Sequence, residues 1–93
     1  MEESPVSFRQ LAASSKEFAR RLMTIGVLAA LGQSQLVEIQ FGAALERGEL
    51  TVEQVRETVV HLAHYVGWPL STGVNEVAER VISRRRKSQE AEG

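Results

Sequence analysis

Cysteine is absent from this sequence, and its absence excludes several kinds of chemistry together. A chain without thiols forms no disulfides, offers no thiolate nucleophile and binds no metal through cysteine. Aromatic residues are also scarce, at 5% of the chain. The hydrophobic residues, 43% of the total, are therefore mainly aliphatic, and we expect a core built mostly from Val, Leu and Ala.

An excess of charge of one sign is lacking too. The formal net charge is −1 at pH 7, which gives no overall field to attract nucleic acid or an acidic membrane surface. No apolar run approaches the ~20 residues that cross a bilayer. The chain starts Met1-Glu2-Glu3, which is acidic where a secretory signal is basic. We therefore expect a cytoplasmic protein that binds neither nucleic acid nor a membrane.

The length of 93 residues gives room for one domain. So short a chain buries only about 60–65% of the surface that its unfolded form exposes, so a single core is marginal and association often adds stability. We expect a homo-oligomer. A basic run followed by acidic residues marks the carboxyl end. The predicted organisation is one helical domain over residues 1–83 and a flexible charged tail over residues 84–93.

Apolar spacing predicts an all-α bundle of four to five helices, because no segment shows the alternation of a strand. The short optional helix covers about residues 5–13, with Ser4 as its N-cap. A helix over about residues 16–31 carries one apolar stripe, at i, i+4, i+7 and i+11: Phe18, Leu22, Ile25 and Ala29. The last helix begins near Pro69 and carries another: Val74, Val77, Ala78, Val81 and Ile82.

The expected helix over residues 34–47 has an unusual polar residue. Its apolar stripe is predicted from Leu36, Ile39, Ala43 and Ala44. Gln40 follows Leu36 by four positions and so points the same way. A polar amide on an apolar stripe needs hydrogen-bond partners or lines a cavity. Gln40 is therefore either a satisfied buried amide or a ligand-orienting group.

The helix over residues 52–66 has the clearest start, because Thr51 and Gln54 form a capping-box pattern. Its apolar stripe contains Val52, Val55, Val59, Leu62, Ala63 and Val66. Glu57, His61 and His64 fall on the opposite face at i, i+4 and i+7. They could form a carboxylate–imidazole acid/base pair, a metal site, or a polar surface. No other His or Cys exists to complete a metal shell, so we expect no metal and no other cofactor.

Three segments resemble the carboxymuconolactone decarboxylase-like family, which includes the alkylhydroperoxidase D-like peroxide reductases. They are LMTIGVLAALG at residues 22–32, ALERGELTVEQVRE at 44–57 and VVHLAHYVGWP at 59–69. The resemblance covers about residues 18–82. It implies an all-helical, alkylhydroperoxidase D-like fold assembled as a homo-trimer or hexamer.

The redox branch of that family uses a Glu on the apolar helix, a Cys-x-x-Cys pair and a His as a proton relay. By spacing, these positions correspond here to Arg21, Gln33, Leu36 and Gln40, so all of them are substituted. The resemblance therefore implies a protein that is not a thiol peroxidase. The decarboxylase branch commonly keeps the His, and the amide of Gln40 cannot replace it as an acid or base near pH 7.

Ligand-binding candidates follow from the same positions. Gln40 could orient a ligand or polarise its carbonyl group, and Arg21 with Arg20 could bind an anionic carboxylate. The family turn adds Tyr65 and Trp68, of which Trp68 could wall an aromatic pocket. The alternatives are structural: a solvated helix edge for Arg21, and core filling with a fixed turn for Trp68.

Two functions remain open from the sequence. The first is a non-redox oligomeric subunit with a pocket for a small molecule. The second is a decarboxylase or lactone-handling lyase that uses His61 or His64 with Glu57 as acid and base. The feature that separates them is whether these imidazoles converge on one cavity with Gln40 and Trp68.

Overall fold

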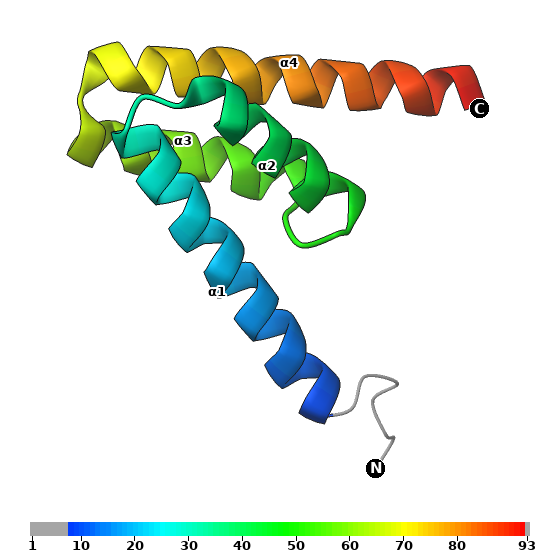
Figure 1. Ribbon diagram of the computed structural model, residues 1–93. Helices are drawn as coiled ribbons and strands as arrows, with labels where there is room; N and C mark the ends of the chain where they lie inside the picture. The colour runs from blue at the N-terminus through cyan, green and yellow to red at the C-terminus, as the bar shows by residue number, and fades with distance from the viewer. Residues whose placement is uncertain (1–7, 93) are drawn as a thin grey trace.

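The structure, a computed structural model, describes the backbone of residues 8–92 and the side chains of residues 16–92. Within that part of the chain it consists of helices and short turns, with no strand (Figure 1). The elements in chain order are α1 (Phe8–Ala30), α2 (Ser34–Glu46), α3 (Val52–Val66) and α4 (Trp68–Glu92). The all-α class is confirmed, with four helices. The predicted N-cap at Ser4 lies outside the described residues.

The amino-terminal segment corrects one expectation. Two helices were predicted, over residues 5–13 and 16–31, but α1 is continuous from Phe8 to Ala30. The expected break lies at Ser14 and Ser15, and a serine inside a helix costs only about 0.5 kcal/mol relative to alanine. Neither Pro nor Gly interrupts the chain between residues 8 and 25, so nothing stops the helix there.

Helix α2 corrects a second expectation. Leu36 and Ile39 of the predicted stripe are 45% and 63% exposed. The side chains of α2 that enter the core are Val37, Phe41, Ala44 and Leu45. Most of α2 is apolar, so periodicity alone does not select the buried face. Packing selects the face with Phe41, which is fully buried and is the largest apolar side chain of this helix.

The turn before α3 and the turn after it follow the sequence signals. Thr51 Oγ1 accepts a hydrogen bond from the Gln54 backbone N–H at 3.1 Å, and Gln54 Oε1 accepts one from the Thr51 N–H at 2.9 Å. This is the predicted capping box. Gly67 then ends α3 with a φ of 86°, which side-chain-bearing residues rarely adopt, so α4 can begin at once with Trp68.

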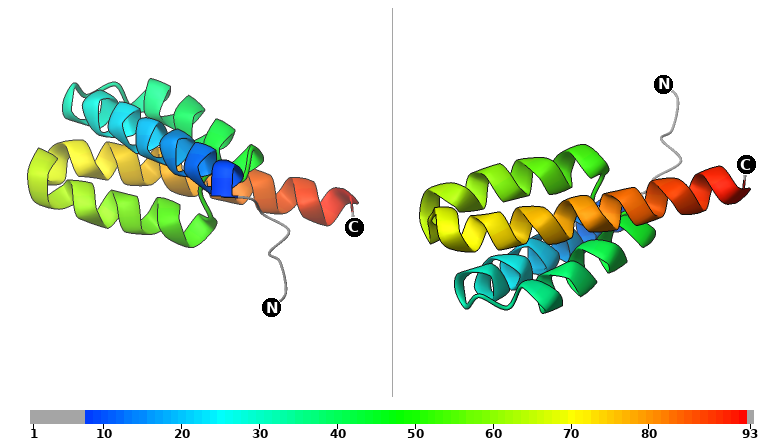
Figure 2. Two further views of the ribbon diagram at one scale, coloured as in Figure 1. Left: turned by 90° about the horizontal axis from the view of Figure 1, so that it is seen from below. Right: turned by 90° about the horizontal axis from the view of Figure 1, so that it is seen from above.

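The core lies where α4 crosses α2 and α3, and α1 packs mainly on α2 (Figures 1 and 2). Every helix contributes a side chain that is fully buried, among them Ile25, Phe41, Val55 and Val74. Burying such an aliphatic side chain contributes roughly 1.5–3 kcal/mol. The predicted stripe of α4 is confirmed in full. Its members Val74, Val77, Ala78, Val81 and Ile82 are all buried.

Helix α4 extends past the ends of α2 and α3 (Figure 2). The helix includes residues 84–92 of the predicted tail and continues to Glu92, because neither Pro nor Gly follows Gly73 before that residue. Arg80 anchors it by donating to Glu38 Oε1 in α2 at 2.9 Å, and Arg84 forms an ion pair with Glu38 Oε2 at 3.0 Å. The mobility of residues 84–93 as a separate tail stays a prediction.

Several apolar side chains of α1 and α2 face outward. Met23 and Val27 on α1 and Leu31 directly after it recur every four residues and are 68%, 54% and 67% exposed. Together with Leu36 and Ile39 of α2 they form what we call the outer apolar residues. Between residues 8 and 92, no helix has the length and apolar content that crossing a bilayer requires.

Candidate functional site

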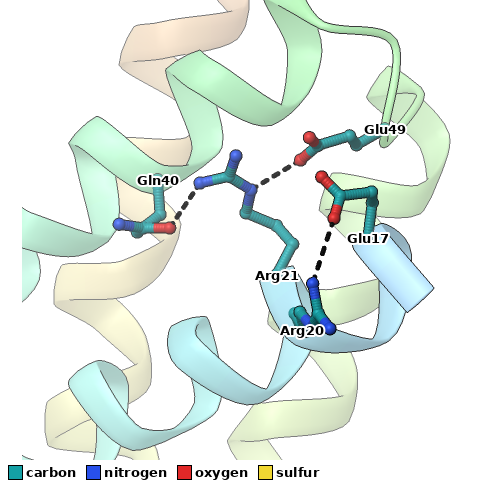
Figure 3. Close-up of polar contacts among 5 residues, drawn as sticks. All are labelled: Glu17, Arg20, Arg21, Gln40 and Glu49. Atoms are coloured by element: carbon teal, nitrogen blue, oxygen red, sulfur yellow. Dashed lines mark hydrogen bonds and ion pairs between the residues drawn. The ribbon is translucent and has the colours of Figure 1, made fainter. Parts of the chain in front are cut away.

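Three side chains from different elements meet at the edge of the bundle (Figure 3). Arg21 lies on α1, Gln40 on α2, and Glu49 in the turn between α2 and α3. The Nε–H of Arg21 donates to Glu49 Oε1 at 2.6 Å, and its Nη1–H donates to Gln40 Oε1 at 2.6 Å. The side chains of Arg21 and Glu49 are only 13% and 12% exposed. We call these three residues the arginine cluster.

Local structure explains why they meet. Arg21 directly precedes Leu22, which packs against the core, so the guanidinium lies at the margin of the buried stripe. Gln40 lies beside the buried Phe41 in the same way. The turn that carries Glu49 is fixed because the Glu49 N–H donates to Ala44 O at 2.8 Å. The next side chain, Leu50, is 3% exposed and holds the turn against the core.

The arginine cluster has no group that exchanges a proton near neutral pH. The hydrogen bond from Arg21 is the main cause that lowers the pKa of Glu49 below its ordinary value of 4.5. Desolvation opposes this shift, and the positive charges of Arg21 and Arg47 reinforce it. Glu49 is therefore ionised at pH 7. A guanidinium stays protonated and an amide does not titrate, so the cluster is a fixed, charge-assisted network.

The cavity beside this cluster is small, at about 170 Å³. Its lining is polar: Glu17, Arg20, Arg21, Thr24, Gln40 and Glu49. Pockets for small ligands usually have about 300–1,000 Å³. Arg21 and Gln40, which were predicted to bind a ligand, thus lie together but bond to each other and to Glu49. Their role toward a ligand stays a prediction.

The predicted acid/base residues lie on the outer face of α3. Glu57, His61 and His64 are all exposed, which agrees with their predicted position opposite the apolar stripe. The His61 ring lies 5.0 Å from that of Tyr65, centroid to centroid, at an interplanar angle of 47°. His64 Nδ1 is 3.0 Å from Val60 O and donates to it in the tautomer that places the proton on Nδ1.

These three residues line a shallow depression of about 410 Å³ with Arg56 and Val60. In the described part of the chain, no three His, Cys, Asp or Glu side chains come close enough to hold a metal ion. The cavity beside Gln40 contains neither imidazole. The convergence that would favour an acid/base site around Gln40 is therefore not found within one subunit.

A larger cavity of about 460 Å³ lies where α3 ends and α4 begins. The residues that line it are Val59, Val60, Ala63, His64, Trp68, Ser71, Thr72 and Asn75. Trp68 is 76% exposed, so it does not fill the core. Tyr65, also 76% exposed, does not line this cavity, although both residues were predicted to bind a ligand together. We call this space the α3–α4 cavity.

Two groups of residues at these sites were not anticipated. Glu49 lies 28 residues after Arg21 in a turn, and nothing in the sequence pattern connects the two. Ser71 and Asn75 of the α3–α4 cavity have a detectable signal. They are polar and spaced i, i+4 at the start of a helix whose predicted stripe consists of Val, Ala and Ile, which marks a polar strip beside the apolar one.

Comparisons with known proteins agree with these positions. The sequence model of the carboxymuconolactone decarboxylase family matches residues 19–80, which include both the arginine cluster and the α3–α4 cavity. A 4-carboxymuconolactone decarboxylase from Acinetobacter baylyi is 34% identical over 63 residues, which are 68% of this chain and 46% of that protein. The chain thus spans about half the length of this curated relative. No solved structure matches significantly. With two thirds of its length matched, this chain belongs to the carboxymuconolactone decarboxylase family.

Proposed function

We propose that this chain is a non-redox subunit of a homo-oligomer, and that it holds a small molecule without converting it. The observation that carries the proposal is the arginine cluster. Arg21 and Gln40 occupy positions that correspond to the proton relay of the family's redox branch. They are joined by a hydrogen bond of 2.6 Å, and Glu49 accepts from the Nε–H of the same guanidinium.

The chemistry of the cluster supports a role without turnover. Peroxide reduction by this family needs a pair of thiols, and the sequence contains no Cys. Decarboxylation or lactone conversion needs a group that gives or takes a proton at the reacting atom. Glu49 is held ionised by a lowered pKa, and both of its neighbours keep one protonation state. The cluster therefore fixes α1, α2 and the following turn together.

The outer apolar residues support the homo-oligomer, as a trimer or a hexamer. Met23, Val27 and Leu31 expose more than half of their surface on one chain, and Leu36 and Ile39 add to it on α2. Covering apolar surface contributes about 25 cal/mol per Å². A second copy of this chain would remove that surface from water, which a small domain with one marginal core needs for stability.

The second candidate is a lyase of the decarboxylase or lactone-handling kind. It is favoured by the named activity of the Acinetobacter relative and by the shared depression that Glu57, His61 and His64 line. In this candidate, the imidazole of His61 or His64 transfers a proton to or from the substrate, and the carboxylate of Glu57 orients that imidazole or exchanges a proton with it.

The deciding experiment compares turnover of γ-carboxymuconolactone by the wild type, His61→Ala and His64→Ala, with the Acinetobacter decarboxylase as the positive control. We expect all three forms of this chain to run at the uncatalysed rate. A wild-type rate above background that falls in either variant would establish the lyase. Sedimentation at micromolar concentration tests the assembly, and a stable species of 10.3 kDa would contradict the homo-oligomer.

A further inference from the structure

We infer that the α3–α4 cavity binds a flat, uncharged, largely apolar molecule that carries one hydrogen-bonding group. This inference rests on the proposed function, because it identifies where the subunit holds its small molecule. It assigns that role to Trp68, Ser71 and Asn75, and not to the arginine cluster, where Arg21 and Gln40 already bond to each other.

The size and the walls of the cavity fit such a ligand. Its volume of about 460 Å³ lies within the usual range for small-molecule sites, whereas the cavity of the arginine cluster is about 170 Å³. Val59, Val60 and Ala63 supply an aliphatic wall from α3. Val59 is 6% exposed and packs in the core, so the part of the wall that it forms is held in place by core packing.

Trp68 adds an aromatic surface on the opposite helix. Its indole is 76% exposed although it borders an apolar cavity, so its own chain leaves most of the ring uncovered. An aromatic ligand gains affinity from an offset or edge-on ring contact beyond what the buried area alone contributes. A flat ring seated between Trp68 and the aliphatic wall would use both surfaces.

The polar groups of the cavity are few, and most of them belong to α4. Thr72 Oγ1 already donates to Trp68 O at 2.8 Å, and His64 Nδ1 lies 3.0 Å from Val60 O. The groups that remain for a ligand are the hydroxyl of Ser71, the amide of Asn75, the indole N–H of Trp68 and the second ring nitrogen of His64, Nε2. Ser71 is 3% exposed and is the polar residue found among the buried side chains of the described part of the chain. The innermost part of the cavity therefore borders a polar group.

The lining also limits the charge of the ligand. Apart from the imidazole of His64, no ionisable side chain borders the α3–α4 cavity, whereas the neighbouring depression also contains Arg56 and Glu57. An ionised ligand would lose hydration in an apolar space without a counter-charge. The cavity therefore favours an uncharged ring compound over a carboxylate or an amine cation.

Trp68 is the single tryptophan of the chain and reports on the cavity directly. The intact protein is titrated with N-phenyl-1-naphthylamine, an uncharged probe, while Trp68 emission and probe emission are recorded. We expect saturable quenching of Trp68 with a matching rise in probe emission. The matched anionic probe, 8-anilinonaphthalene-1-sulfonate, should bind on the order of tenfold more weakly.

Two variants locate the binding. Ala63→Leu places extra carbon atoms in the cavity and should weaken probe binding on the order of tenfold or more, while Ala91→Leu makes the same change near the end of α4 and should leave it unaltered. Circular dichroism establishes that both variants are folded. Equal probe affinity in both variants would overturn the inference, and so would tighter binding of the sulfonate.

A third result would also overturn it. If Trp68 emission shifts with protein concentration and does not respond to the probe, another copy of the chain covers the cavity. These outcomes are separate from the turnover assay. Detectable lactone turnover would contradict the proposal that the subunit is not catalytic, but it would not contradict a binding site in the α3–α4 cavity. A probe titration without any change in emission would contradict the binding site, but it would not contradict the role as a non-redox subunit.

Discussion

At the α1–α2 edge of the molecule, Arg21, Gln40 and Glu49 bond to one another beside a cavity of about 170 Å³, while at the α3–α4 end His64, Trp68, Ser71 and Asn75 border about 460 Å³. The first region is polar, and its side chains are already satisfied by their own hydrogen bonds. The second is larger and mostly apolar. The family resemblance predicts ligand binding at Arg21 and Gln40 in the first region, but the second region has the larger cavity.

The difference implies opposite responses to mutation. Side chains that satisfy one another contribute to stability and leave few donors for a ligand. Exposed side chains at the rim of a cavity, such as Trp68, contribute little to the fold and remain free to bind. Substitutions in the arginine cluster should therefore change the free energy of unfolding, and substitutions at the rim of the α3–α4 cavity should change affinity instead.

The largest effect is expected for Arg21→Ala. It removes two short hydrogen bonds and leaves Glu49, 12% exposed, without its cation. We expect a loss of about 2 kcal/mol in the free energy of unfolding, measured by urea denaturation at pH 7. Arg20→Ala is the matched control, because the Arg20 side chain is 74% exposed and its pair with Glu17 is longer, at 3.5 Å. Equal losses in the two variants would show that the cluster contributes nothing specific.

A smaller loss is expected for Gln40→Ala. This change removes one acceptor from Arg21 and keeps the ion pair with Glu49 intact. The cost should be about 1.5 kcal/mol, at the lower end of the range for a hydrogen bond to a charged group. Comparison of the double variant with both single variants measures the coupling. Additive losses would mean that Gln40 and Arg21 act independently despite their 2.6 Å contact.

The pH dependence of stability should reveal the same cluster. Because the folded state lowers the pKa of Glu49 below its ordinary value of 4.5, the stabilisation is fully present above pH 4.5. It is lost as the pH falls through the lowered folded-state value. Urea denaturation of the wild type and Glu49→Gln should therefore differ most near pH 7 and converge in acid. Curves that stay parallel down to low pH would contradict an ionised, arginine-bonded Glu49.

The smallest effect on stability is expected for Trp68→Ala. The indole is 76% exposed and its backbone carbonyl, not its ring, accepts the bond from Thr72. We expect the free energy of unfolding to stay within about 0.5 kcal/mol of the wild type, measured by circular dichroism in urea. A loss as large as that of Arg21→Ala would mean that the cavity rim is structural, and the contrast between the two regions would disappear.

How well the sequence predicted the buried residues and the ends of the helices differs from helix to helix. The stripe of α4 and the cap of α3 were predicted correctly, because both depend on residues within a few positions of one another. The buried face of α2 was predicted wrongly. Leu36 and Phe41 both have apolar neighbours at helical spacing, and only packing against the rest of the bundle distinguishes them.

The candidate sites show the same limit. The sequence alone established that no thiol chemistry is available and that Glu57, His61 and His64 share an outer face, since composition and helical periodicity are local properties. Only the tertiary structure decided that Arg21 meets Glu49 across 28 residues, and that Trp68 borders a cavity with Ser71. Both depend on the path of a turn and on how two helices pack, which are set by the whole core together.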